Sequence, residues 1–377
     1  MSDDRGVAKL PVVDAQGESD GSPATDGVRS ATSDPPPKSA RGSSALGLMR
    51  RFRLHEWGTI AFFLLFFVIV GVDKGGSYVS TGNIFTTLAD NGDGAFLALA
   101  ATVTLISGQF DLSIGATAGL SAVLMAGLTS SQGLPIWLTI ICVVLVGATI
   151  GAINGLLVVK LKVNVFIATL GMSGALSGVA LIYAHGEIIF NGIPASLTNF
   201  GRQSPIGDFP TIILVPIAMT LVMWFVARQT VFGRHLFAVG SNAESSRLAG
   251  VKVERTIVLS LMVASVLAAL GGVVLISRFG SIDPTTGSGF LLPAYAAAYL
   301  GSSILSDGRF SVVSAVVATY LVAYAGSGLV ELGYTYSGNI FNGVVLVGAV
   351  GLNEFLRRHF GAAAKARLEP KLSDLGV

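Results

Sequence analysis

The most unusual polar residues of this chain lie in one stretch, GQFDLSIGATAG, at Gly108–Gly119. It places a carboxylate, Asp111, among small and hydroxyl residues between two long apolar runs. Asp favours the N-cap of a helix, because its side chain accepts hydrogen bonds from the free N–H groups of the first turn. We expect Asp111 to cap a helix through the N–H groups of Leu112–Gly115, at the inner end of a membrane span, where water could reach it. With Gly108, Ser113 and Gly115, the same turn could also expose polar backbone beside a path through the membrane, and the two roles are compatible.

Four more polar side chains stand inside apolar runs: Asn154, Thr169, Asn339 and Asn342. Each could form a hydrogen bond to a neighbouring helix, as polar residues between membrane helices do. Each could instead line a path for a polar solute. The sequence leaves both roles open.

A second polar interruption, LADNGDGAF at 88–96, puts Asp90, Asn91 and Asp93 inside an apolar run. Polar breaks at membrane depth persist only where protein or water covers them. The segment is therefore either a kinked helix beside a cavity or a surface helix that leads into a shorter span. No Lys, Arg or His stands in the middle of an expected span, which argues against an ion-coupled mechanism. Asp90 and Asp93 keep that alternative open.

The sequence contains no motif for binding the phosphates of a nucleotide. It lacks the G-x-x-x-x-G-K-[S/T] phosphate loop, and no lysine follows a glycine anywhere. We expect no cofactor in this chain. The net charge of +2 gives no indication of nucleic acid as a partner.

The elements that position these residues are membrane helices. Only 12% of the 377 residues are charged and 52% are hydrophobic, about half the charge of a soluble domain. The chain is therefore expected to be an all-α polytopic protein of the lipid bilayer. The ten expected spans are Trp57–Val72, Asn83–Ser107, Leu112–Thr129, Leu134–Val159, Val163–Tyr183, Thr211–Ala227, Thr256–Ser277, Leu291–Leu305, Ser311–Gly326 and Gly338–Leu356.

Basic residues give the orientation of these spans, because Lys and Arg favour the cytoplasmic side. With the N-terminus inside, thirteen lie in inner connections and three in outer ones. The inner ones are Arg50, Arg51, Arg53, Lys160, Lys162, Arg228, Arg234, Arg247, Lys252, Arg255, Arg309, Arg357 and Arg358, and the outer ones are Lys74, Arg202 and Arg278. Both termini are thus predicted to be cytoplasmic.

The chain is expected to divide into three parts. Residues 1–49 are rich in Asp, Gly, Ser and Pro, which predicts a disordered cytoplasmic tail. A membrane domain is expected over 50–358, followed by a second cytoplasmic tail over 359–377.

The longest inner connection, 228–255, is expected to contain a short helix. Ser241 with Glu244 fits a capping box, and Gly250 fits a helix end, which predicts a helix over Asn242–Ala249. Because so short a helix is unstable alone, it must pack against the membrane domain, a partner or lipid headgroups.

The longest outer connection, 184–210, shows little helical periodicity. It is expected to be an exposed loop, either a docking surface or a plain connector.

The two Asp-containing, glycine-rich breaks suggest an internal symmetry. GQFDLSIGATAG joins the second and third spans inside, and GSIDPTTGSG, Gly280–Gly289, joins the seventh and eighth outside. Similar breaks five spans apart on opposite faces fit a 5+5 inverted repeat.

Three motifs in order resemble those of sugar ABC-transporter permeases of the ribose/xylose/galactoside type. GQFDLSIG resembles the family's Gly-x-x-Asp-Leu-Ser-(Val/Ile)-Gly signature. VFGRHLFAVGSNAESSRLAGV, Val231–Val251, resembles its cytoplasmic coupling segment, and SRFGSIDPTTGSGF, Ser277–Phe290, resembles its later Arg…Pro-x-x-Gly-x-Gly stretch. The resemblance covers roughly Thr81–Leu356. Departures such as Leu292–Tyr295, where the family tends to have an Asp and an Ala-rich run, leave the sugar and the pairing partner open.

The resemblance implies an inner-membrane permease subunit of a monosaccharide importer that performs no catalysis itself. Its implied partners are an ABC ATPase subunit, a periplasmic sugar-binding protein, and a second copy of the permease or a sister permease. The implied translocation-path residues are Gly108, Asp111, Ser113, Gly115, Asn154 and Thr169. The implied residues for ATPase coupling are Gly240, Asn242, Glu244, Arg247 and Gly250.

Other functions stay open at this point. A permease for branched-chain amino acids or nucleosides would share the fold. An ion-coupled secondary transporter would work without an ATPase and would depend on Asp90, Asp93 or Asp111. A passive channel is the third alternative.

Overall fold

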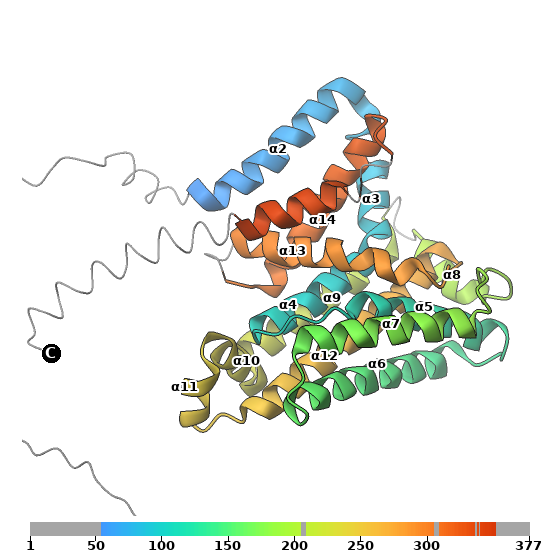
Figure 1. The fold of residues 1–377 in the computed structure, drawn as a ribbon. Helices are drawn as coiled ribbons and strands as arrows, with labels where there is room; N and C mark the ends of the chain where they lie inside the picture. The colour runs from blue at the N-terminus through green and yellow to red at the C-terminus, as the bar shows by residue number, and fades with distance from the viewer. Residues whose placement is uncertain (1–53, 205–208, 305–308, 336–337, 339, 352–377) are drawn as a thin grey trace, which may run out of the picture. The chain divides into compact units, whose positions relative to one another are not determined.

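The computed structural model describes residues 54–204, 209–304, 309–335, 338 and 340–351, with side chains from Phe63 onward. The helices that line up along this part of the chain (Figure 1) are α2 Leu54–Lys74, η1 Gly75–Ser77, α3 Thr81–Asp90, α4 Gly92–Ile106, α5 Ile114–Ser130, α6 Ile136–Val159, α7 Val165–Tyr183, α8 Ala195–Arg202, η2 Thr211–Ile213, α9 Leu214–Gln229, α10 Val231–Ser241, α11 Ala243–Leu248, α12 Val253–Phe279, η3 Thr286–Phe290, α13 Leu291–Ile304 and α14 Val312–Glu331. A further apolar helix covers Ile340–Gly351. Within these ranges no β-strand forms, and one isolated antiparallel bridge joins Ile189 to Ile282. The all-α prediction is confirmed.

Five of these helices are long and apolar enough to cross a membrane: Ile136–Val159, Val165–Tyr183, Thr211–Gln229, Val253–Phe279 and Val312–Glu331. The pair Phe63–Ser77 and Thr81–Asp90, bent by 114°, could form a sixth span. Every expected span overlaps an apolar helix, but several of these helices are shorter than a full crossing. Ten spans and the inverted repeat therefore stay predictions. Both termini lie outside the described residues.

Helix α12 lies at the centre of the bundle, packed against α4, α5 and α6. Three glycines of α6 spaced by four residues, Gly147, Gly151 and Gly155, make this approach close. A Cβ built on Gly151 would lie 2.5 Å from the Leu261 carbonyl oxygen of α12. Small residues at this spacing let membrane helices bring their backbones together. A second group, α2, α13 and α14, packs together on the other side of α4.

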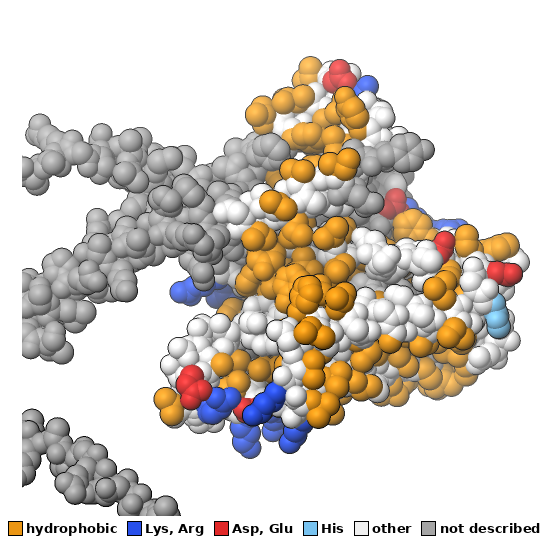
Figure 2. Space-filling view, in the orientation of Figure 1, with side chains coloured by type: hydrophobic (Ala, Val, Ile, Leu, Met, Phe, Trp, Pro, Cys, Tyr) orange, Lys and Arg blue, Asp and Glu red, His pale blue; other side chains and the backbone are white. Residues whose placement is uncertain are grey.

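The two ends of the helix bundle differ in charge. Helices α10 and α11 lie at one end and α8 at the other (Figure 1). Lys and Arg side chains gather around α10 and α11, while hydrophobic side chains cover the middle of the face shown (Figure 2). Trp137, Leu145, Ile182 and Leu221 are each at least 60% exposed. Such an apolar surface suits contact with lipid, and the basic end is the one that the sequence assigns to the cytoplasm.

The expectation of a plain exposed loop over 184–210 is wrong in part. Eight of its residues form α8, whose Leu197 and Gly201 are buried. Arg202 donates from Nε to the Arg278 carbonyl oxygen over 3.1 Å and from Nη2 to the Phe279 carbonyl oxygen over 2.7 Å. This connection is therefore fastened to the end of α12. Residues 205–208 lie outside the described part.

Candidate functional site

The turn between α4 and α5 is closed by Asp111. Its Oδ1 accepts the Ser113 N–H over 2.8 Å and the Ser113 hydroxyl over 2.6 Å. The expectation that Asp111 caps the helix is wrong in its position, because Ser113 occupies the N-cap of α5 without a side-chain capping bond. Asp111 stands two residues earlier and fixes the turn that delivers the chain into α5. It is fully buried, so water does not reach it in this structure.

Three distant helices attach to this turn, and we call Asp111, Ser113, Asn154, Thr169 and Tyr295 the signature node. Asn154 of α6 donates from Nδ2 to the Ser113 hydroxyl over 2.9 Å. The Thr169 hydroxyl of α7 accepts the Leu112 N–H over 3.0 Å. The Tyr295 hydroxyl of α13 accepts the Asp111 N–H over 2.8 Å and donates to the Asp111 carbonyl oxygen over 2.9 Å. The four sequence-predicted side chains of the node thus lie together, and Tyr295 is a fifth member that the sequence did not indicate.

The glycines around the turn permit close backbone contacts. A Cβ on Gly115 would lie 2.6 Å from the Gly287 carbonyl oxygen, and one on Gly119 would lie 2.7 Å from the Gly287 Cα. Gly108 has a positive φ of 77° and lies against Gly240 of α10. A Cβ on Gly240 would lie only 1.7 Å from the Ile106 carbonyl oxygen. The coupling segment therefore touches the signature turn directly.

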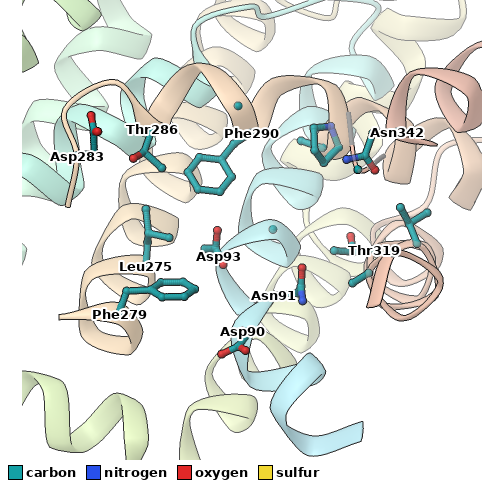
Figure 3. A pocket seen from close by; sticks show the side chains of 18 of the residues that line it. Asp90, Asn91, Asp93, Leu275, Phe279, Asp283, Thr286, Phe290, Thr319 and Asn342 are labelled. Carbon is teal, nitrogen blue, oxygen red and sulfur yellow. The ribbon is translucent and has the colours of Figure 1, made fainter. Parts of the chain in front are cut away.

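A cavity lies elsewhere, at the break between α3 and α4 (Figure 3). It has a volume of about 620 Å³ and is walled by the start of α4, the end of α12, η3, α13, α14 and the helix around Asn342. None of the six predicted path residues, from Gly108 to Thr169, is among its lining residues. Of the other polar residues singled out in the sequence, Asp90, Asn91, Asp93 and Asn342 do line it. Asn339 lies outside the described residues.

Polar and aromatic side chains face this cavity together. Asp93 and Phe290 lie on facing sides of it, with Thr286 and Phe279 on the α12–η3 side and Thr319 and Asn342 on the other (Figure 3). The break at Asn91 is thus a kinked helix beside a cavity, which is the first of the two arrangements that the sequence allowed.

The three carboxylates of the cavity lie in different surroundings. Asp90 forms an ion pair with Arg278, with Oδ1 and Nε 2.5 Å apart. Asp283 accepts the Thr285 N–H and hydroxyl over 2.8 and 2.7 Å, and these hydrogen bonds hold the pKa of Asp283 below its usual range. Asp93 is 6% exposed and has no side-chain hydrogen bond or ion pair within the described part of the chain. No group of His, Cys, Asp and Glu among the described residues could hold a metal ion.

The two Asp-containing breaks share one local geometry. Asp111 accepts both donors of Ser113 just as Asp283 accepts both donors of Thr285, with distances between 2.6 and 2.8 Å. This similarity agrees with the predicted repeat, which still stays a prediction.

The coupling segment differs from its predicted form at the cap. Asn242, not Ser241, caps α11, with its Oδ1 accepting the Ser245 N–H over 2.9 Å. Ser241 closes α10 and donates to the Phe237 carbonyl oxygen. Glu244 does not reach back to a capping residue but pairs with Arg247 over 2.7 Å. The predicted end at Gly250 agrees with its positive φ of 84°.

Arg247 fastens α11 to the central helix. Its Nη1 contacts Glu244 and its Nη2 contacts Glu254 at the start of α12, both over 2.7 Å. These bonds raise the pKa of the Arg247 guanidinium further above its already high usual value. The guanidinium is half exposed, so a partner could reach it.

Comparison with known proteins gives one family. A family model described as branched-chain amino acid transport system / permease component matches residues 83–350. The autoinducer 2 import system permease of Enterobacter sp. strain 638 is 32% identical, over 82% of this chain and 91% of the relative. The fructose import permease of Rhizobium meliloti is 30% identical over 78% and 84%, and the ribose import permease of Escherichia coli K12 is 29% identical over 73% and 86%. No solved structure matches the chain significantly.

Proposed function

The chain belongs to the branched-chain amino acid transport system / permease component family, and from this premise we propose that it is the membrane-spanning subunit of an ATP-driven importer of a monosaccharide. The family and the apolar helices make it a multi-pass protein of the inner membrane, as the sequence indicated. The relatives named above are import permeases for fructose, ribose and autoinducer 2, which supports a sugar-like substrate.

The main structural support for this proposal is the cavity at the α3–α4 break. Translocation sites are typically built where discontinuous helices expose backbone and polar side chains to a cavity. Two such discontinuities meet here: the break at Asn91 and the irregular segment between α12 and α13. We assign the path to this cavity and give the signature node the task of holding α5, α6, α7 and α13 around it.

The lining chemistry separates the substrate classes. Its described polar groups are carboxylates, amides and hydroxyls, and Lys, Arg and His are absent from the described lining. An amino acid presents an ammonium group, which Asp93 or Asp283 could pair with, but also a carboxylate, for which the described lining supplies no cation. A neutral polyol offers hydroxyl donors to these same acceptors. The lining therefore favours a sugar over a branched-chain amino acid, while a nucleoside remains the second candidate.

ATP would be bound by a separate ABC ATPase, and the α10–α11 segment is the proposed contact. Support comes from the continuity of α12, which begins at the Arg247–Glu254 pair and ends at the Arg278–Asp90 pair beside the cavity. A displacement of α11 would move one helix of 27 residues that reaches the substrate path. A periplasmic sugar-binding protein and a second permease, identical or a sister chain, complete the proposed assembly.

The test is uptake of radiolabelled monosaccharides, nucleosides and branched-chain amino acids by the native host with the gene deleted. Loss of uptake of one monosaccharide, restored by the wild-type gene, is the expected result. Loss of nucleoside or branched-chain amino acid uptake with all sugar uptake intact would contradict the proposal.

A further inference from the structure

Asp93 is a carboxylate without a side-chain partner at the centre of the cavity. It is the second residue of α4, directly after the break at Asn91. Its carboxylate forms no hydrogen bond or ion pair with another side chain in the described part of the chain, and it lies in the lining of the cavity. The other three carboxylates near the two breaks all have side-chain partners: Asp90 has Arg278, Asp111 has Ser113 and Asp283 has Thr285.

A buried carboxylate needs hydrogen-bond donors, because burial removes the water that would otherwise supply them. Two carboxylate oxygens can accept about four hydrogen bonds, and no side chain of the described residues provides one. The side chain faces the cavity (Figure 3), so the remaining donors can come from a molecule inside it.

The neighbours of Asp93 define the chemistry of such a molecule. Asn91 donates from Nδ2 to the Thr87 carbonyl oxygen and Thr319 donates to the Ala315 carbonyl oxygen, so both keep acceptor capacity toward the cavity. Phe279, Phe290 and Phe341 supply apolar ring surfaces on its wall. A cavity of about 620 Å³ lies in the ordinary range of small-molecule sites. Many acceptors beside flat apolar surfaces suit a ligand with hydroxyl donors on its edge and C–H groups on its faces.

We propose that Asp93 is the specificity-determining residue of this permease, and that its carboxylate accepts hydrogen bonds from hydroxyl groups of the transported sugar while Phe290 packs against the sugar ring. The inference rests on the proposed function and adds to it the residue that recognises the substrate. Each sugar hydroxyl that donates to Asp93 supplies a hydrogen bond that burial has removed.

The experiment combines Asp93→Asn with single-deoxy analogues of the imported sugar, in host cells that lack the chromosomal copy. The wild-type should show a KM raised about tenfold or more for the analogue that lacks the recognised hydroxyl. Asp93→Asn should raise the KM for the parent sugar by a similar factor, yet change the KM for that analogue little. Such dependence on one hydroxyl is a result that a merely structural role would not give.

Controls separate the possible failures. Asp73→Asn, the same change at an exposed carboxylate at the end of α2, should leave every KM unchanged. If Asp93→Asn does not reach the membrane, Asp93→Glu keeps the carboxylate and should alter the ranking of the deoxy analogues. Equal losses on all analogues, or no loss, would overturn the role of Asp93. Absence of monosaccharide uptake by the wild-type would overturn the proposed function itself.

Discussion

At the scale of single residues, the two fully or nearly buried carboxylates among the described residues have opposite surroundings. Asp111 is bonded on one oxygen to both donors of Ser113 and belongs to a packed node. Asp93 faces a cavity and forms no side-chain hydrogen bond within the described residues. A carboxylate that is bonded within the protein stabilises the fold, whereas one that faces a cavity is available to a ligand.

Substitution of Asp111 tests its role in the turn. Asp111→Asn keeps an oxygen that can accept the Ser113 N–H and hydroxyl, so we expect little change in thermal stability. Asp111→Leu leaves those buried donors without a partner, at about 1–3 kcal/mol for each group, and should lower the melting temperature clearly. Melting of the detergent-solubilised protein measures this difference. Equal, large losses in both variants would instead show that the charge itself is required.

Gly287 and Gly289 form a matched pair within η3. A Cβ on Gly287 would lie 2.8 Å from the Gly115 carbonyl oxygen, whereas nothing lies within 4 Å of a Cβ on Gly289. Gly287→Ala should therefore destabilise the protein by about 1–3 kcal/mol, the usual cost of overpacking, and Gly289→Ala should not. The readout is the fraction of protein that stays monodisperse after heating. Similar behaviour of both variants would show that η3 is not packed against α5 as described.

Sequence reasoning reached part of the residue-level picture. Asp111, Ser113, Asn154 and Thr169 were singled out because polar groups are rare inside apolar runs. Tyr295 could not be found in this way, because its contact with Asp111 joins residues 184 positions apart. The sequence indicated the cavity lining at Asp90, Asn91, Asp93 and Asn342, and through the motif Ser277–Phe290. It could not indicate that these segments, far apart in the chain, line one cavity.

At the scale of elements, α12 connects the basic end of the molecule with the cavity. Its first turn carries Glu254, bonded to Arg247 of α11, and its last turn carries Arg278, bonded to Asp90 of α3. Between them it packs against α4, α5 and α6. A helix held in this way at both ends is suited to transmit a displacement.

The Asp90–Arg278 pair offers a double-mutant test of this connection. The Asp90 side chain is 35% exposed and the Arg278 side chain 23%. The contribution of the ion pair to stability is therefore expected to lie between that of a fully exposed pair and that of a buried pair. Asp90→Asn and Arg278→Gln should each reduce uptake, and the double variant should lose less than the sum of both. Strict additivity would indicate that the two residues act independently.

Arg247 tests the coupling segment. Arg247→Ala removes both ion pairs of α11, whereas Glu244→Ala removes one and leaves the link to Glu254. We expect normal membrane insertion in both, with uptake lost in the first and reduced in the second. ATP hydrolysis in proteoliposomes should then no longer respond to the sugar-loaded binding protein. Uptake untouched by Arg247→Ala would contradict the assignment of the coupling segment.

Helix boundaries were predicted well where length and composition decide them. The expected Leu134–Val159 and Val163–Tyr183 begin within two residues of α6 and α7 and end at the same residues. The sequence predicts Ser241 as the cap of α11, one residue before the observed cap Asn242. Ser241 is instead the last residue of α10, a helix that the sequence did not indicate. That helix is held by the contact of Gly240 with the Ile106 carbonyl oxygen, a tertiary contact that a local capping rule cannot include. Helix α8 was missed for a related reason, since its buried face packs on α12.

At the scale of the whole molecule, the described helices form a bundle with a basic end, an apolar surface and a cavity at a broken helix (Figures 1 and 2). Composition alone predicted the membrane class, since so few residues are charged. The number of crossings is not fixed by composition, because α4, α5 and α13 are too short to span a bilayer straight. The family assignment agrees with the three motifs found in the sequence.

The most direct test of the proposed importer is affinity purification of the tagged protein from membranes of its native host in mild detergent, followed by mass spectrometry of the proteins that accompany it. We predict an ABC ATPase and a periplasmic sugar-binding protein among them. Repeated purification of the chain without any ATPase would contradict the account and would favour an ion-coupled transporter that depends on Asp90, Asp93 and Asp111.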